Sequence, residues 1–254
     1  MLEVEGVGVS FGGVQALRAV SFRARRDDIT SIVGPNGAGK TTLFNAVTGF
    51  YRPGSGQIVF DGRDITGWRP SRIAASGLVR TFQKTEVFGG LAVRSAVEIG
   101  TVCGRDFPLW RVIWPGAVRR ARAQAAAEAA AILDLCGLTR LADKLCRALS
   151  YGEQRLLEIA LALAARPRLL MLDEPASGLN PTEARRLGEL ITRIRADGIG
   201  IVLIEHNMQL VMRISDRIVV LHHGEKIAEG TPDVVAQDAR VIEAYLGGQI
   251  LASA

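Results

Sequence analysis

The sequence predicts an α/β fold in which helices cover a parallel β-sheet. Three short runs, at 29–33, 168–175 and 200–204, are rich in isoleucine, valine and leucine, as are strands buried on both faces of a parallel sheet. The first two are each followed by a short loop and a segment that favours a helix. The chain has 254 residues, of which 48% are hydrophobic, so it can form one large domain or two small ones around a sizeable core.

The loop after the first of these strands fits the pattern G-x-x-x-x-G-K-[ST] of a phosphate-binding loop. Its glycines let backbone N–H groups point toward a β-phosphate, and the helix that follows, around 43–47, adds the positive end of its dipole. Lys40 supplies a point charge for the β- and γ-phosphates, and the Thr41 hydroxyl is a ligand for Mg²⁺. A chance glycine-rich turn would need neither the strand before it nor the helix after it. The loop comprises Gly34, Pro35, Asn36, Gly37, Ala38, Gly39, Lys40, Thr41 and Thr42.

The chain before this loop favours two strands, at 2–10 and 17–24, around a turn at residues 11–13. Phe11, if exposed beside that turn, can stack on an adenine ring, whereas a phenylalanine considered alone more often belongs to a core. After the first helix the sequence favours a turn, a strand and a tight turn, at 52–56, 57–60 and 61–62.

Gln83 ends a predicted strand at 78–82, which follows a short helix at 71–76. A glutamine at a strand end can reach a bound Mg²⁺ and the water that attacks a phosphate. The alternative is an ordinary exposed loop residue.

Residues 88–148 differ in character from the rest of the chain. The segment 121–135 is alanine-rich with helical spacing, and Gly137 ends it. The stretch 107–116 before it has two tryptophans between prolines and no strong periodicity. That stretch is either an apolar surface for a partner or a loop folded onto its own helices.

Ser150 and Glu153 fit the S-x-x-E capping box at the start of a helix that continues to Ala165. The box is a complete structural explanation of both residues. The functional interpretation is that this capped helix N-terminus also faces a phosphate.

Asp173 and Glu174 follow the apolar residues of the second run. Asp173 suits Mg²⁺ through a water molecule, and Glu174 is placed to accept a proton from water that attacks a γ-phosphate. A solvated pair of loop carboxylates is the alternative, which the phosphate loop argues against. His206 follows the third run and can hydrogen-bond a γ-phosphate, although a lone histidine at a strand end more often has a structural role.

The rest of the chain favours regular elements. Asn180 and Pro181 open a helix that runs to Arg195, and His222 and His223 lie in the turn of a hairpin, where we expect both to be solvated. The two strands of that hairpin and a final amphipathic helix are predicted at 217–221, 225–229 and 233–246.

Composition limits the cellular location of the protein, the state of its cysteines and the kind of surface it presents. No apolar run approaches the ~18 residues needed to cross a bilayer, and residues 1–5 are acidic where a secretory signal would be basic, so we expect a cytosolic protein. Cys103, Cys136 and Cys146 lack C-x-x-C spacing, which predicts reduced thiols rather than disulfides or a zinc site. The net charge of +5 is spread along the chain, which indicates a solvated basic surface near anionic lipid or phosphate more than a nucleic-acid site.

Six features occur together and in order, and they resemble the motif set of an ABC-type ATPase over about residues 2–230. They are the loop 34–42, Gln83, Leu149-Ser150-Tyr151-Gly152-Glu153-Gln154, Asp173-Glu174, Ser177-Gly178-Leu179-Asn180 and His206. With Arg-Thr-Phe-Gln at 80–83 and Ile-Glu-His at 204–206, the set is similar to the ATPases of branched-chain amino acid and urea uptake transporters. Those systems pair two ATPase subunits with two membrane permeases and an external binding protein.

The resemblance implies a P-loop NTPase (RecA-like) fold, which has a parallel-sheet core, an antiparallel β subdomain and an α-helical subdomain. It implies that 1–254 is a single ABC ATPase domain. Its parts would be a nucleotide-binding core with the β subdomain at 1–87 and 149–230, a helical subdomain at 88–148, and a C-terminal helix and tail at 231–254.

The resemblance also implies how ATP and Mg²⁺ are held. Phe11 would stack on the adenine, and residues 34–42 would bind the phosphates, with Lys40 contributing to catalysis and Thr41 binding Mg²⁺. Gln83 would sense Mg²⁺, act in catalysis and couple the site to the permease.

The remaining motif residues receive roles in hydrolysis from the same resemblance. Asp173 would support Mg²⁺, Glu174 would be the general base, and His206 would stabilise the γ-phosphate. Ser150 and Gly152 would act on nucleotide held by a second ATPase subunit, identical or related, with the segment 177–180 lining the interface.

Two residues depart from the usual motifs. Tyr151 replaces the first glycine of the common Leu-Ser-Gly-Gly-Gln signature, and Asn180 stands where many members carry aspartate. Ser150 and Gly152 are retained, so we expect the phosphate contact to be retained and the protein to hydrolyse ATP.

These features favour an importer subunit at the cytoplasmic face of the inner membrane. Its partners would be two permeases, a second ATPase subunit and, through the permeases, a solute-binding protein, with no nucleic acid. A soluble ABC ATPase of translation or DNA repair usually has two ATPase domains or a long coiled coil, and this chain has one phosphate loop. A non-catalytic scaffold would not need Asp173, Glu174 and His206, and the signature variant disfavours an exporter. The sequence leaves the solute open.

Overall fold

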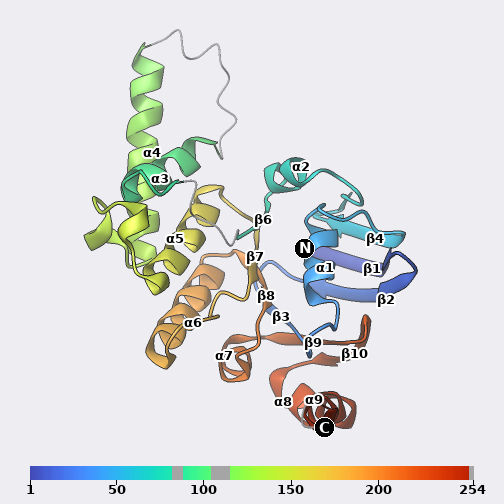
Figure 1. Ribbon diagram of the computed structural model, residues 1–254. Coiled ribbons are helices and arrows are strands. Elements are labelled where there is room, and N and C mark those ends of the chain that lie inside the picture. Colours follow the sequence, from blue (N-terminus) through green and yellow to red (C-terminus); the bar gives the residue numbers. More distant parts are fainter. Residues whose placement is uncertain (82–87, 104–114, 252–254) are drawn as a thin grey trace.

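The computed structural model describes residues 1–81, 88–103 and 115–251, and a six-stranded sheet lies at its centre (Figure 1). The strand order is β10-β9-β3-β8-β7-β6, and its pairs are parallel except for the antiparallel pair of β9 and β10. The sheet comprises β3 (Ile29–Val33), β6 (Leu78–Arg80), β7 (Leu169–Asp173), β8 (Gly200–Ile204), β9 (Arg217–His222) and β10 (Glu225–Gly230).

Both faces of this sheet are buried, which explains why its strands are continuously apolar. Along β7, Leu170 and Leu172 pack into a core formed with the helices on one face, whereas Leu169 and Met171 pack into a core on the other. Alternate residues of a strand point to opposite faces, so a strand covered on both sides needs apolar residues throughout. The α/β fold with a parallel sheet is confirmed.

A second, antiparallel sheet has the order β2-β1-β4-β5. Its first two strands are longer than the sequence predicts and meet at a two-residue turn, Gly12-Gly13, whose φ angles are 51° and 88°. Phe11 is therefore the last residue of its strand, paired with Val14, rather than part of the turn. The strands are β1 (Leu2–Phe11), β2 (Val14–Ala24), β4 (Ser55–Phe60) and β5 (Arg63–Asp64).

Helices cover the six-stranded sheet and form a cluster beside it. In that cluster α3 packs against both α4 and α5, and α4 projects away from the sheets (Figure 1). Helices α3 and α7 were not predicted from the sequence, and α4 begins earlier than the predicted helix at 121–135. The helices up to residue 214 are α1 (Lys40–Val47), α2 (Pro70–Ala75), α3 (Val93–Cys103), α4 (Pro115–Leu135), α5 (Tyr151–Ala164), α6 (Pro181–Ala196) and α7 (Met208–Ile214), with 3₁₀ turns at Thr139–Leu141 and Cys146–Ala148.

The C-terminal region corrects one prediction, since its described residues, 231–251, contain two helices where the sequence suggests one. These are α8 (Pro232–Ala236) and α9 (Ala239–Leu251), which lie beside β10 (Figure 1). The Asp238 carboxylate accepts a hydrogen bond from the N–H of Arg240 at 2.9 Å. That contact starts a new helix where the amphipathic pattern continues without a break.

The three cysteines are free thiols, as predicted. Cys136 and Cys146 are buried, and Cys103 is exposed. Burial raises the pKa of the Cys136 thiol to about 12, so this group stays protonated and unreactive at neutral pH.

Candidate functional site

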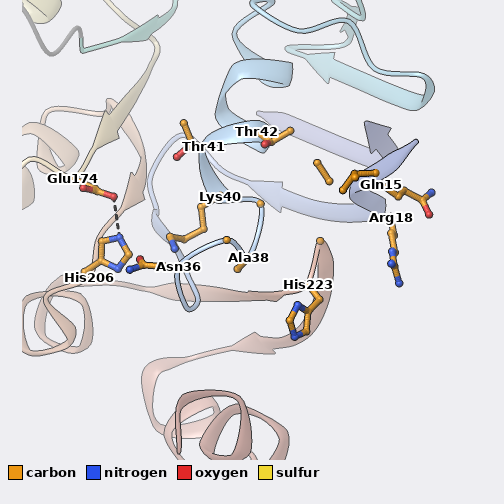
Figure 2. Close-up of a pocket in the computed structure, with 15 residues that line it drawn as sticks. Gln15, Arg18, Asn36, Ala38, Lys40, Thr41, Thr42, Glu174, His206 and His223 are labelled. Carbon is orange, nitrogen blue, oxygen red and sulfur yellow. Dashed lines mark hydrogen bonds and ion pairs between the residues drawn. The ribbon is translucent and has the colours of Figure 1, made fainter. Parts of the chain in front are cut away.

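A cavity of about 490 Å³ lies beyond the carboxyl ends of β3, β7 and β8, the usual place for a ligand in a parallel sheet (Figure 2). The phosphate loop forms the largest share of its wall, and the rest comes from the start of β2, the residues after β7 and β8 and the turn between β9 and β10. The lining residues are Val14, Gln15, Ala16, Arg18, residues 36–42, Glu174, His206, His223 and Gly224.

The phosphate loop has the closely packed glycines that the motif requires. At Gly34 a Cβ would lie 2.1 Å from the carbonyl oxygen of Leu221, and at Gly39, with φ at 98°, it would lie 2.8 Å from that of Ala16. The N–H of Gly224, in the hairpin turn, donates to the carbonyl of Ala38 at 3.1 Å. The loop is therefore held in shape by the hairpin from the far end of the chain.

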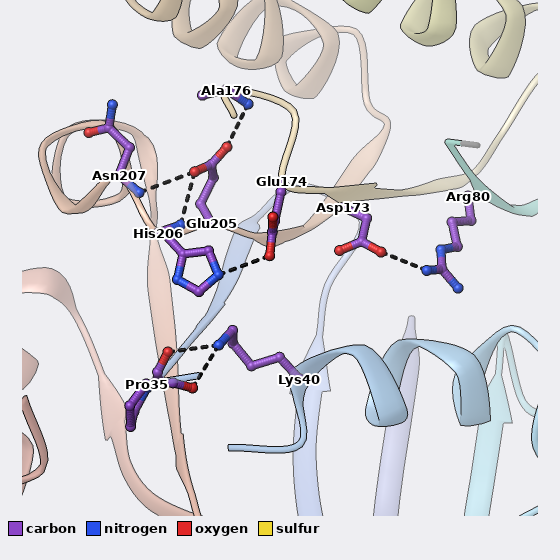
Figure 3. Close-up of polar contacts among 10 residues, drawn as sticks. Pro35, Lys40, Arg80, Asp173, Glu174, Ala176, Glu205, His206 and Asn207 are labelled. Carbon is purple, nitrogen blue, oxygen red and sulfur yellow. Dashed lines mark hydrogen bonds and ion pairs between the residues drawn. The ribbon is translucent and has the colours of Figure 1, made fainter. Parts of the chain in front are cut away.

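Lys40 points into the loop (Figure 3). Its ammonium group donates to the carbonyl oxygens of Gly34 and Pro35, at 2.7 Å and 3.0 Å. Burial lowers the pKa of this amine, and the nearby carboxylates of Glu174 and Asp173 oppose that change. A cation in this position, with two acidic groups in range, provides the charge that the β- and γ-phosphates need.

Glu174 and His206 face each other across the mouth of the cavity (Figures 2 and 3). The Nε2 atom of His206 lies 2.9 Å from Oε1 of Glu174, and both side chains are partly exposed to solvent. Glu174 has a φ of 47°, an uncommon backbone conformation for a residue with a side chain. The pair places a carboxylate and an imidazole side by side, where both can contact the same water molecule.

Asp173 lies deeper than Glu174 and forms an ion pair that the sequence did not indicate. Its Oδ2 accepts from the guanidinium of Arg80 at 2.6 Å, and the two side chains are only 5% and 14% exposed. The same guanidinium donates to Oδ1 of Asn45, in α1, at 2.6 Å. Arg80 thus joins the end of β7 to the helix that follows the phosphate loop.

Mg²⁺ fits the donor set at this end of the cavity. Thr41 lines the cavity and offers its hydroxyl. Asp173 does not line the cavity and is paired with Arg80, so its carboxylate, an oxygen donor of the kind that Mg²⁺ prefers, would reach the ion through a water molecule. Within the described residues no group of three or more His, Cys, Asp or Glu side chains could hold a metal unaided. Such a site suits an ion that is held partly by substrate phosphates.

Phe11 lies outside the residues that line the cavity. Its ring is 45% exposed and packs edge-on against Tyr51, with the ring centroids 5.0 Å apart. Val14 and Ala16, from the next strand, contribute apolar side chains to the wall instead. The stacking of Phe11 on adenine stays a prediction.

Ser150 and Gly152 lie at the start of α5 and do not line the cavity of their own chain. Ser150 caps the helix as predicted, with both hydrogen bonds of the capping box to Glu153 present. The Tyr151 ring lies over Gly178, where a Cβ would come within 2.9 Å of it, and Gly152 lies against Glu183. The segments 149–154 and 177–180 therefore form one surface.

Asn180 caps α6 by accepting from the N–H groups of Thr182 and Glu183, each at 3.0 Å. An asparagine in place of the usual aspartate therefore still caps the helix well. Gln83 and the stretch 107–114 lie outside the described residues, so their predicted roles stay predictions.

Four residues of the site and its surroundings were missed from the sequence. Arg18 and His223 line the cavity from β2 and from the β9–β10 turn, and His223 is exposed there, as expected for that turn. Arg80 and Glu205 hold the end of β7 and the loop after it. Arg18 and His223 belong to no short pattern. Arg80 and Glu205 lie in the stretches 80–83 and 204–206 that carry the resemblance, but neither of them received a role from the sequence, because their contacts depend on the tertiary structure.

We expect Ser150→Ala to stay folded and to lose most ATPase activity. Losing a helix cap costs about 1 kcal/mol, which is small beside a domain stability of roughly 5–15 kcal/mol. Thermal unfolding and phosphate release, measured on one preparation, separate the two roles. Asp238→Ala, which removes a comparable contact at the start of α9, should keep full activity. Intact hydrolysis in folded Ser150→Ala would leave Ser150 with a capping role alone.

Within the parts of the chain that the structure covers, no helix is both long enough and apolar enough to cross a membrane. A family model described as "ABC transporter" matches residues 17–177, and one described as "Branched-chain amino acid ATP-binding cassette transporter" matches residues 225–250.

Curated relatives match nearly the whole chain. The high-affinity branched-chain amino acid transport ATP-binding protein BraF of Pseudomonas aeruginosa is 44% identical over 253 residues, which cover 97% of this chain and 98% of BraF. The corresponding LivG protein of Escherichia coli is 41% identical, with 97% and 98% covered. The crystal structure of the ADP conformation of an ATP-binding cassette of an ABC transporter superposes with a TM-score of 0.85 at 32% identity, covering 97% of this chain and 98% of that one. This chain, with its phosphate loop and its Glu174–His206 pair, therefore belongs to the ABC transporter family as an ATP-binding cassette and is an ATPase.

Proposed function

We propose that the protein is the ATP-hydrolysing subunit of an importer for branched-chain amino acids or related small polar solutes. The observation that carries the proposal is the 44% identity to BraF, which extends over both the catalytic segments and the C-terminal region at 225–250. The subunit would bind peripherally at the cytoplasmic face of the inner membrane. Two permeases, a second ATPase subunit and an external solute-binding protein would complete the complex.

In this proposal each region of the chain has its own role. Residues 1–87 and 149–230 form the nucleotide-binding core with the β subdomain, and 88–148 form a helical subdomain that passes the change of state to the permease. The segments 149–154 and 177–180 would meet the second subunit, and Ser150, Tyr151 and Ser177 are exposed there. Their shared surface, formed where Tyr151 packs over Gly178, supports this arrangement.

We propose the following roles in hydrolysis, which the geometry of the cavity supports for the phosphate loop, Glu174 and His206. The backbone of residues 34–42 and the ammonium of Lys40 hold the phosphates, with Phe11 on the adenine and Ser150 and Gly152 of the second subunit on the γ-phosphate. Glu174 accepts the proton of the attacking water, and His206, 2.9 Å from it, contacts the γ-phosphate. Mg²⁺, held by Thr41, Gln83 and Asp173, would neutralise charge on the phosphate oxygens. This reaction needs positioning and charge neutralisation more than covalent chemistry.

We expect tagged Glu174→Gln protein, purified from detergent-solubilised cells with Mg-ATP, to carry its partners with it. Mass spectrometry should find two multi-span proteins and one or two ATPase subunits, and the binding protein encoded nearby would identify the solute. A purification without nucleotide is the control for the ATP-dependent second subunit. Ribosomal or DNA-repair partners without a membrane protein would overturn the importer and favour a soluble ABC ATPase.

A further inference from the structure

Glu205 is a buried carboxyl group beside the cavity whose role the motifs do not explain. It follows β8 directly, and only 3% of its surface is exposed. Oε1 accepts from the N–H of Ala176 at 2.6 Å, and Oε2 accepts from those of His206 and Asn207 at 2.9 Å and 3.1 Å (Figure 3). Both oxygens are acceptors in this arrangement, which is that of an ionised carboxylate.

These three N–H groups belong to two different loops. Ala176 lies two residues after Glu174, in the loop that leaves β7, whereas His206 and Asn207 lie in the loop that leaves β8. The Glu174 N–H also donates to the carbonyl of Ile204, at 2.9 Å. The β7 loop is thus bonded to the end of β8 on both sides of Pro175.

The strained backbone of Glu174 explains why such a bond is needed. A non-glycine residue with a φ of 47° keeps that conformation only where its surroundings enforce it. The bond that the Glu174 N–H donates to Ile204 fixes the Glu174 amide, and the bond that the Ala176 N–H donates to Glu205 fixes the chain just after it. Together they set the direction in which the Glu174 side chain leaves the backbone, and therefore its 2.9 Å distance from His206.

We propose that Glu205 is a positioning residue for ATP hydrolysis. Its carboxylate holds the loop of Glu174 in register with the loop of His206, so that base and imidazole meet the same water and phosphate. Because Ala176 directly precedes the segment 177–180, the same bond ties that segment to His206. The inference rests on the proposed function, since it assigns Glu205 a part in the hydrolysis proposed there.

Glu205→Asp separates positioning from local folding. An aspartate keeps the charge and can still accept the N–H two residues ahead, as in an Asx-turn. Its side chain is shorter by about 1.5 Å, so it loses the bond to Ala176. Glu158→Asp is the matched control, because Glu158 is also largely buried and pairs with Arg155 at 2.9 Å in α5, away from the cavity.

We expect Glu205→Asp to lower kcat by roughly 10- to 100-fold while KM for ATP stays close to that of the wild type. In the same variant, amide hydrogen exchange should become faster at the peptide that contains Ala176 and stay unchanged at the peptide that contains Glu158. Glu158→Asp should keep its kcat.

Two results would overturn the proposal. One is a wild-type kcat in Glu205→Asp although exchange at Ala176 has quickened. The other is an equal loss of kcat in Glu158→Asp, which would indicate a general effect of shortening a buried carboxylate. If the wild-type protein itself failed to hydrolyse ATP, the proposed function would fail separately, because the exchange measurement needs no hydrolysis.

Discussion

Glu174→Gln is expected to bind ATP and to form the ATP-bound dimer while kcat falls by roughly 10²–10⁴-fold, the usual contribution of a general base. Glutamine matches glutamate in shape, so the hydrogen bond to His206 Nε2 can persist, but an amide does not accept the proton of the attacking water. Lys40 and the loop at 36–42 are untouched, which is why nucleotide binding should survive.

Phosphate release under single-turnover conditions, with light scattering for the mass of the ATP-bound species, tests this expectation. Glu189→Gln, an exposed change on α6, is the matched control and should hydrolyse ATP normally. Near-normal turnover in Glu174→Gln would remove Glu174 from the role of base. Loss of ATP binding would instead indicate that its charge helps to hold the site together.

Arg80→Ala is expected to lower the free energy of unfolding by about 3–5 kcal/mol, because it leaves the partner of a buried ion pair without its counter-charge. Arg80 and Asp173 are 14% and 5% exposed, and their charged atoms lie 2.6 Å apart. The change also removes the bond from Arg80 to Asn45. We expect the lower end of that range, because Lys40 is near enough to interact with Asp173.

Urea unfolding measures this loss, and two further variants show its origin. The double variant Arg80→Met with Asp173→Leu should recover much of the stability, because apolar residues of similar size often replace a buried pair without loss. Arg94→Ala breaks an exposed pair with Asp143 and should cost no more than about 1 kcal/mol. An Arg80→Ala protein as stable as the wild type would show that the pair contributes nothing to the fold.

The sequence could predict those parts of the fold and the site that depend on neighbouring residues. The phosphate loop, the capping box at Ser150 and the two carboxylates at the end of β7 are local patterns. The structure has the cap and brings the loop and Glu174 to one cavity. The strand that precedes His206 was enough to predict where this residue lies. Its contact with Glu174 depends in addition on β7 and β8 being neighbours.

The parts that were missed depend on distant residues. Arg80 reaches Asp173 from the neighbouring strand, and Glu205 reaches Ala176 from the loop that leaves β8 to the loop that leaves β7. The sequence did not predict the break between α8 and α9, because Asp238 starts a helix inside an amphipathic run that continues on both sides. In each case the structure is decided by a hydrogen bond of one side chain, and the periodic pattern of apolar residues around it in the sequence gives no sign of that bond.

The order of strands has a consequence for how the chain is made. β3 carries the phosphate loop, and its strand neighbours are β8 and β9, which lie roughly 170 residues or more further along the chain. At a synthesis rate of about 5–20 residues per second, the ribosome needs roughly 10–30 s to supply the first of them. The antiparallel sheet is complete by residue 64, so it can form early. The nascent chain therefore carries an apolar strand without strand partners throughout that interval, and its nucleotide pocket is among the last features to form.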